Sequence, residues 1–174
     1  MAAQFPDNIR LLALDVDGVL TDGGIYVSDQ GFESKRFDVR DGLAIKAWQF
    51  AGNQVAILSA RDVPCVNYRA TQLGISLVIQ GSKNKALGIA SLCEKCGISA
   101  ADTCYIGDDW IDVPALRAVG FAVAVPAADE SVREHVDYVT TAGGGNGAIR
   151  EVIEKLLAAQ GKLEMAREHF VTPA

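Results

Sequence analysis

The stretch LLALDVDGVLTDGG, residues 11–24, decides how the rest of the chain is interpreted. An apolar run ends there in two carboxylates, Asp15 and Asp17, which are separated by one residue. A short apolar run bounded by polar residues and glycines is typical of a buried strand. In an open parallel sheet, ligands bind beyond the carboxyl ends of the strands. The stretch therefore predicts a central strand with a functional site at its end.

Short β-type runs and helix-length stretches alternate along the chain, which indicates an α/β fold with helices on both faces of a parallel sheet. With 174 residues, 49% of them hydrophobic, we predict a single domain over residues 1–174, a Rossmann-like three-layer sandwich. The predicted strands cover residues 10–16, 54–59, 76–80, 104–107, 122–125 and 138–140. The predicted helices cover about 41–51, 62–73, 84–96, 109–119 and 147–160. Asp41 and Asp62 are expected to cap the first two helices.

Two segments depart from this alternation. Residues 23–39 hold two alternating runs around residues 28–31, which predicts a protruding β-hairpin after the first strand. The hairpin is either a surface excursion or an oligomer contact. An oligomer contact would cover the exposed edges of its strands. The tail, residues 161–174, is polar with Phe170 and Val171 near its end, and is expected to be frayed or docked on a partner. Trp48 and Phe50 are both expected to pack in the core.

Charge and hydropathy restrict the possible partners. The net charge of -6 argues against nucleic acid, which favours a basic surface. No apolar run approaches the roughly 20 residues that span a bilayer, and the start lacks the features of a secretory signal. We therefore expect a cytoplasmic protein with no membrane partner. Cys93 and Cys96 have a metal-like spacing but no second ligand pair, so inert thiols are the favoured interpretation.

Polar residues follow three of the predicted strands. Asp15 and Asp17 follow the first, Ser59 ends the second, and Asp108, with Asp109 and Asp112, follows the fourth. If these strands are neighbours, the carboxylates converge and repel one another unless a cation intervenes. Because the candidate ligands are all oxygens, the sequence predicts a hard ion, and Mg²⁺ is the preferred one.

A lysine near a helix start supplies the positive counterpart for an anionic substrate. Lys85 is the candidate, with Lys83 as a rival two residues away. A metal, a lysine, the Ser59 hydroxyl and a helix terminus make a phosphoryl pocket. Asp15 can then attack phosphorus to give an aspartyl phosphate, and Asp17 can act as acid and base. Gly18 lets the chain turn tightly after them.

These residues resemble the four motifs of the haloacid dehalogenase superfamily of phosphatases. DVDGVLTDG matches the first motif, Ser59 the second, Lys85 the third and GDDWID the fourth. The resemblance implies that Asp15 is the nucleophile and a Mg²⁺ ligand, that Asp17 binds Mg²⁺ through its backbone carbonyl, and that Asp108 completes the protein ligands. It also implies that Asp109 and Asp112 support the metal site without binding Mg²⁺ directly. The substrate-binding residues that it implies are Gly18, Thr21, Ala60 and Arg61.

A nearer resemblance is to the capless branch of that superfamily, the 3-deoxy-D-manno-octulosonate 8-phosphate (KDO 8-phosphate) phosphatases. It is carried by the hairpin, by the RDG of residues 40–42, by GDDWIDVP and by GGGNGAIREV. Residues 18–53 hold only the hairpin and one helix, which leaves no room for a cap domain. The resemblance implies a phosphorylated sugar-acid substrate and a homotetramer in which hairpins pack around the central axis and a neighbour closes each site.

Other functions stay open at this point. The branch often has Thr-Gly where this chain has Ser59 and Ala60, a second glycine near Ala44, and an arginine at Asn146. Ser59 keeps the hydroxyl for phosphate, but the differences at Ala44 and Asn146 make a nonulosonate 9-phosphate an alternative substrate. Arg61 could pair with a sugar-acid carboxylate or simply lie on the surface. A phosphotransferase would need water excluded, generally by a cap. A catalytically silent oligomerisation or regulatory subunit is disfavoured because unneeded buried charges reduce stability.

Overall fold

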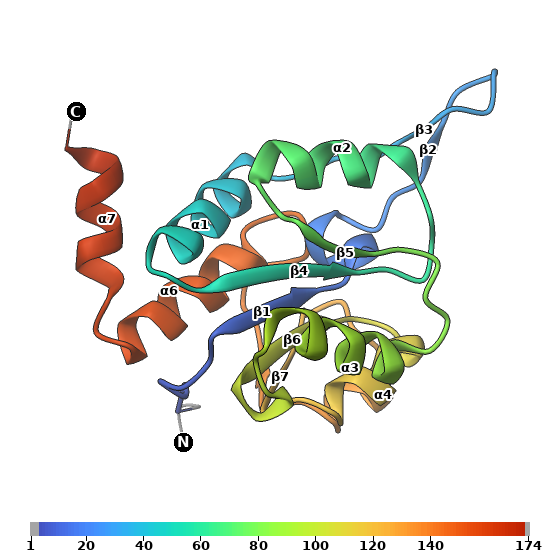
Figure 1. The fold of residues 1–174 in the computed structure, drawn as a ribbon. Helices are drawn as coiled ribbons and strands as arrows, with labels where there is room; N and C mark the ends of the chain where they lie inside the picture. The colour runs from blue at the N-terminus through green and yellow to red at the C-terminus, as the bar shows by residue number, and fades with distance from the viewer. Residues whose placement is uncertain (1–3, 173–174) are drawn as a thin grey trace.

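A computed structural model describes residues 4–172 and has a six-stranded parallel sheet at its centre (Figure 1). The strand order is β5-β4-β1-β6-β7-β8, so β1 lies in the middle, between β4 and β6. All four residues of β1 are fully buried, as expected for a strand covered on both faces. The predicted strands are confirmed. They are β1 (Leu11–Leu14), β4 (Gln54–Leu58), β5 (Leu77–Ile79), β6 (Thr103–Gly107), β7 (Phe121–Ala124) and β8 (Tyr138–Val139).

Helices cover both faces of the sheet, which confirms the predicted three-layer fold (Figure 1). In Figure 1, α1 (Val39–Phe50) and α2 (Pro64–Leu73) lie above the sheet, and α6 (Ala148–Ala159) packs along α1. The layer below contains α3 (Lys85–Cys96) and α4 (Val113–Leu116). A short α5 (Glu130–Arg133) precedes β8.

Two predicted helix caps and one predicted helix differ from those observed. Asp38, not Asp41, caps α1 by accepting a hydrogen bond from the backbone N–H of Arg40. Asp62 caps nothing, because α2 begins at Pro64, whose fixed φ suits the first helical position. The helix predicted over residues 109–119 is a 3₁₀ turn, η3 (Trp110–Asp112), followed by the four-residue α4. Asn84 caps α3 at the predicted place.

The tail forms α7 (Leu163–Val171), which packs against α1 and α6 of its own chain rather than fraying. The ring of His169 stacks on Phe50, with centroids 3.7 Å apart. Phe50 is 45% exposed and belongs to this surface contact, whereas Trp48 is fully buried. The prediction that both aromatic residues lie in the core is wrong for Phe50.

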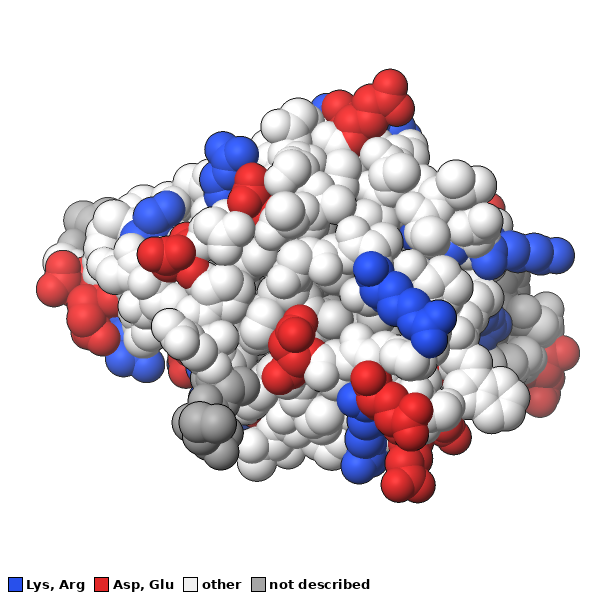
Figure 2. Space-filling view, turned by 90° about the horizontal axis from the view of Figure 1, so that it is seen from below, with Lys and Arg blue, Asp and Glu red and all other residues white. Residues whose placement is uncertain are grey.

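The predicted hairpin is present as β2 (Tyr26–Val27) paired antiparallel with β3 (Glu33–Ser34), and it projects from the domain (Figure 1). No described segment is long enough to be a cap domain, because only the hairpin and α1 lie between β1 and β4. Within residues 4–172, no helix has the length and apolarity to cross a bilayer. On the lower face, basic and acidic side chains are interspersed (Figure 2).

Candidate active site

The turn after β1 brings the first pair of carboxylates to the edge of the sheet. The irregular helical turn η1 (Val16–Leu20) contains Gly18 with φ 85°, a conformation that L side chains rarely adopt. A Cβ at Gly18 would also lie 2.0 Å from Oδ2 of Asp108. The Thr21 hydroxyl accepts hydrogen bonds from the backbone N–H groups of Gly18 and Gly23 and is fully buried. Thr21 thus fixes this turn, and its role in binding substrate stays a prediction.

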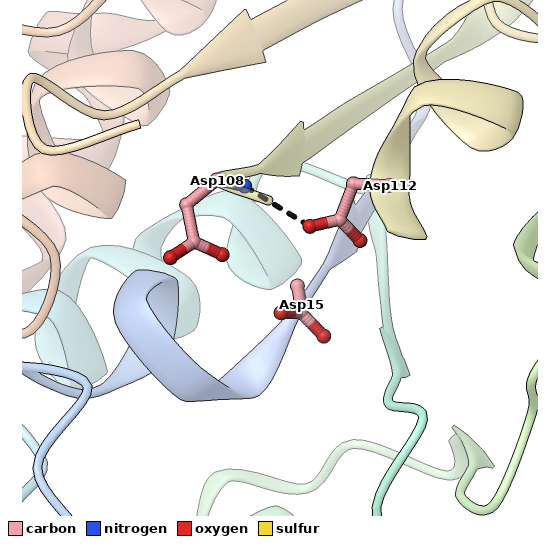
Figure 3. Close-up of side chains that lie close together, drawn as sticks. All are labelled: Asp15, Asp108 and Asp112. Carbon is pink, nitrogen blue, oxygen red and sulfur yellow. Dashed lines mark hydrogen bonds between the residues drawn. The ribbon is translucent and has the colours of Figure 1, made fainter. Parts of the chain in front are cut away.

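Three carboxylates from two neighbouring strand ends point toward one another (Figure 3). Oxygen atoms of Asp15, Asp108 and Asp112 all lie within 4.8 Å of one another. Asp15 follows β1 and Asp108 follows β6, which pair directly, so the predicted convergence is observed. The Asp109 carboxylate is exposed and caps η3 through the backbone N–H of Trp110.

Lys85 lies beneath this cluster with no exposed surface. Its ammonium donates to Oδ1 of Asp15 at 2.6 Å, to Oδ1 of Asp112 at 2.9 Å and to the carbonyl of Leu58 at 2.9 Å. Burial opposes the charge of Lys85, but the two carboxylates outweigh burial and raise the pKa of Lys85 above its ordinary value. Lys83 is exposed, so the structure selects Lys85 over its rival.

Asp112 is held in place by donors on both of its oxygens. Tyr105 donates its hydroxyl to Oδ1 at 2.6 Å, and the backbone N–H groups of Asp108 and Asp109 donate to Oδ2 at 3.0 and 3.2 Å. Tyr105 was not predicted, because in a buried strand it is indistinguishable from a core aromatic residue. These bonds orient Asp112 as a support for Lys85 and for the segment that carries Asp108.

The residues fit a hard cation. Burial, and then the neighbouring acids, raise the pKa of the Asp15 carboxyl, and the same causes raise the pKa of Asp108 to about 7. The Lys85 ammonium lowers both pKa values but does not offset burial and the neighbouring acids, so a second positive charge would stabilise the ionised carboxylates. Oxygen ligands of this kind match Mg²⁺. Asp15 and Asp108 are therefore the side chains suited to hold it.

These pKa shifts predict an unusual pH dependence of stability without metal. Because the pKa of Asp108 is about 7 in the folded state and 3.8 ordinarily, the native protein binds more protons than the unfolded chain between these values. The free energy of unfolding should therefore fall as pH rises from 5 to 7.5 in EDTA. Mg²⁺ should raise the melting temperature more at pH 7.5 than at pH 5. Equal Mg²⁺ stabilisation at both pH values, measured by differential scanning fluorimetry, would contradict this assignment.

A hollow of about 290 Å³ opens above the cluster. It is lined by Asp15, Asp17, Gly18, Gly23, Ser59, Ala60, Arg61, Lys85, Asp108, Asp109 and Ile111. Ser59 is buried at the end of β4, where its hydroxyl accepts from the backbone N–H of Arg61 at 3.2 Å. Of the predicted site residues, only Thr21 and Asp112 do not line the hollow, and both brace its walls.

The Asp17 side chain is not part of the carboxylate cluster and contacts the hairpin. It forms an ion pair with Lys35, whose side chain has no exposed surface. Lys35 also pairs with Oε1 of Glu33 at 2.8 Å, and Oε2 of Glu33 pairs with Arg61 at 2.6 Å. Glu33 and Lys35 were not predicted, because only the folded position of the hairpin brings them to the site.

A glycine segment braces the turn that carries Asp17. A Cβ at Gly144 would lie 1.7 Å from the carbonyl oxygen of Gly18, so only glycine fits there. Next to it, the N–H of Gly145 donates to the carbonyl of Val19 at 2.9 Å. Asp41, which is 1% exposed, accepts from the backbone N–H groups of Gly147 and Arg150 at 3.2 and 2.9 Å. Asp41 therefore anchors the start of α6 rather than capping its own helix.

Comparison with known proteins places this geometry among phosphatases. The sequence profile of haloacid dehalogenase-like hydrolases matches residues 69–153. The chain is 46% identical over 161 residues to 3-deoxy-D-manno-octulosonate 8-phosphate phosphatase KdsC of Escherichia coli K12, covering 92% of this chain and 86% of that protein. It is 44% identical over 156 residues to KdsC of Haemophilus influenzae Rd, covering 90% and 87%.

Solved structures agree with these sequence relatives. The Moraxella catarrhalis KDO 8-phosphate phosphatase, in complex with magnesium, phosphate and KDO, superposes with a TM-score of 0.91 at 43% identity, covering 94% of each chain. The cobalt-bound form of the phosphatase from Haemophilus influenzae superposes with a TM-score of 0.89 at 43% identity, covering 91% of this chain and 93% of that one.

Proposed function

We propose that this chain, which belongs to the haloacid dehalogenase superfamily and to its KDO 8-phosphate phosphatases, is a Mg²⁺-dependent hydrolase of KDO 8-phosphate. The observation that carries the proposal is the convergence of Asp15, Asp108 and the buried Lys85 in one hollow at the sheet edge. The identity of 46% over most of the chain supports the same substrate class.

In the first half of the proposed reaction, Asp15 is the nucleophile. Lys85 holds Oδ1 of Asp15, which leaves Oδ2 for attack on phosphorus. As the new oxygen–phosphorus bond forms, the bond to the sugar oxygen breaks, and Asp17 in its protonated form gives that oxygen a proton. Ser59 binds a phosphoryl oxygen, and the charge of Lys85 next to Asp15 offsets the negative charge of the transferred group. Mg²⁺, which Asp15 and Asp108 would hold, would supply further charge neutralisation.

In the second half, water hydrolyses the aspartyl phosphate. Asp17, now ionised, takes a proton from the water as it attacks phosphorus, and Asp15 leaves as a carboxylate. The hollow is open to solvent in the described chain, and no cap covers it, which favours water over another acceptor. We propose hydrolysis rather than phosphoryl transfer for this reason.

The test is release of inorganic phosphate by the purified protein with Mg²⁺ and with EDTA. KDO 8-phosphate should be the preferred substrate, with a higher kcat/KM than the 9-phosphates of KDN and of an N-acylneuraminate. Preference for a 9-phosphate would move the assignment to the nonulosonate alternative. No release from any of these or from p-nitrophenyl phosphate, with any divalent ion, would indicate a silent oligomerisation or regulatory subunit.

A homotetramer that buries the hairpins forms part of the proposal. Support comes from four large apolar side chains exposed on this projection. They are Ile25, Tyr26, Val27 and Phe32, which are 55%, 51%, 63% and 70% exposed. A cluster of this kind on a projecting element is typical of an interaction surface.

The hairpin contact makes a prediction about assembly. Val27→Asp places a charge in the proposed interface and should shift the protein from tetramer to smaller species, as measured by size-exclusion chromatography with light scattering. Leu87→Asp, at a residue 68% exposed on α3, is the matched control and should keep the wild-type size. A Val27→Asp protein of unchanged mass would exclude the hairpin as the assembly contact.

A further inference from the structure

Arg61 stands between two hollows. It lines the hollow that contains Asp15 and Lys85, and it also lines a neighbouring one of about 560 Å³. The second hollow is formed by Gly31, Phe32, Glu33, Arg61, Asp62, Val63, Pro64 and Cys65. If the phosphate of a substrate binds in the first hollow, the rest of the substrate lies next to Arg61 or in the second hollow.

Glu33 of the hairpin already forms an ion pair with Arg61. Its Oε2 lies 2.6 Å from a terminal nitrogen of Arg61, and the Arg61 side chain is 39% exposed. The other oxygen of Glu33 pairs with Lys35. This second bond fixes the hairpin carboxylate opposite the guanidinium at the mouth of the site. The pKa of Glu33 lies below its ordinary value, first because of its hydrogen bond to Lys35, so Glu33 is an anion.

We propose that Glu33 is a specificity-determining residue that stands in for the carboxylate of a sugar-acid substrate on Arg61. The inference rests on the proposed function, which supplies a substrate bearing both a phosphate and a carboxylate. When that carboxylate arrives it replaces Glu33 on Arg61, and Glu33 keeps Lys35 as its partner. A neutral sugar phosphate has no group to exchange and leaves the pair intact.

Because of this exchange, Glu33 competes with the carboxylate of an acidic substrate for Arg61. Because Arg61 is partly exposed, its pair with Glu33 is a weak one and can be displaced. Removing the charge of Glu33 should lower KM for an acidic substrate by about two- to fivefold, the range of an exposed ion pair. The kcat should hardly change, because Lys35 keeps its contact with Asp17.

The experiment compares wild type, Glu33→Gln and Asp29→Asn on KDO 8-phosphate and on ribose 5-phosphate, a neutral sugar phosphate. Asp29 is the matched control, because it is an exposed acid at the tip of the same hairpin. Glu33→Gln should lower KM for KDO 8-phosphate only, and Asp29→Asn should change neither KM. Arg61→Met should raise KM for KDO 8-phosphate and abolish the gain from Glu33→Gln in the double variant.

A second measurement is independent of the natural substrate. Free KDO should inhibit hydrolysis of p-nitrophenyl phosphate competitively, with a lower inhibition constant in Glu33→Gln than in wild type. An unchanged inhibition constant, or an equal fall of KM for the acidic and the neutral phosphate, would overturn the inference. Failure of the proposed function is a separate result, because it shows as no phosphate release from KDO 8-phosphate by the wild type.

Discussion

Asp15→Asn is expected to lower kcat for KDO 8-phosphate by about 10⁶-fold, the order of loss when a covalent nucleophile is removed. The amide is the same size as the carboxylate, and its oxygen can still accept from the Lys85 ammonium, so the fold should survive. It has no carboxylate oxygen with which to attack phosphorus. Phosphate release at saturating Mg²⁺ measures the loss, and circular dichroism checks the fold.

A neighbouring acid provides the comparison for this variant. Asp109 lines the same hollow but is exposed, and its carboxylate caps η3. Asp109→Asn should therefore lose far less activity than Asp15→Asn. If Asp15→Asn turned over within tenfold of wild type, the covalent mechanism would be excluded, and Asp15 would be a metal ligand at most.

Lys85→Met should lower both activity and stability. The variant removes the cation that bonds to Asp15 and Asp112 and leaves those carboxylates buried without it. Breaking a buried ion pair from one side costs about 3–5 kcal/mol, which corresponds to a fall of about 10 °C in melting temperature for a domain of this size. Loss of a positive group at the phosphoryl oxygens should lower kcat by about 10²- to 10³-fold.

Lys83→Met is the matched control for this prediction. It makes the same substitution two residues away, at an exposed side chain. Thermal unfolding and phosphate release should both stay at the wild-type level in Lys83→Met. Equal losses in the two variants would show that general charge near α3, and not the bonds of Lys85, supports the site.

The sheet and most of the site could be predicted because both depend on local patterns. Apolar runs define the strands, and strands that run parallel end at one edge, so the sequence predicts that Asp15, Ser59 and Asp108 converge. The spacing between Asp15 and Asp17 also predicted two carboxylates on one turn. The pattern left open which groups each carboxylate contacts, since Asp17 pairs with Lys35 and is not part of the cluster that contains Asp108.

The missed features depend on contacts between distant segments. The predicted cap of α1, Asp41, lies three residues after the observed cap, Asp38. The structure uses Asp38, because Asp41 lies against the start of α6, more than 100 residues away. The error at Phe50 is local instead, because Trp48 and Phe50 lie about 200° apart around the helix and cannot both face the core.

Gly144 and Gly145 pack against the turn that carries Asp17, and this contact has a consequence for synthesis of the protein. A ribosome that has reached residue 140 has already made every charged side chain of the site, but not the glycine segment that packs against Gly18 and Val19. The turn carrying Asp17 gains that support only when the last fifth of the chain emerges. A nascent polypeptide thus holds its reactive groups before it holds the structure that aligns them.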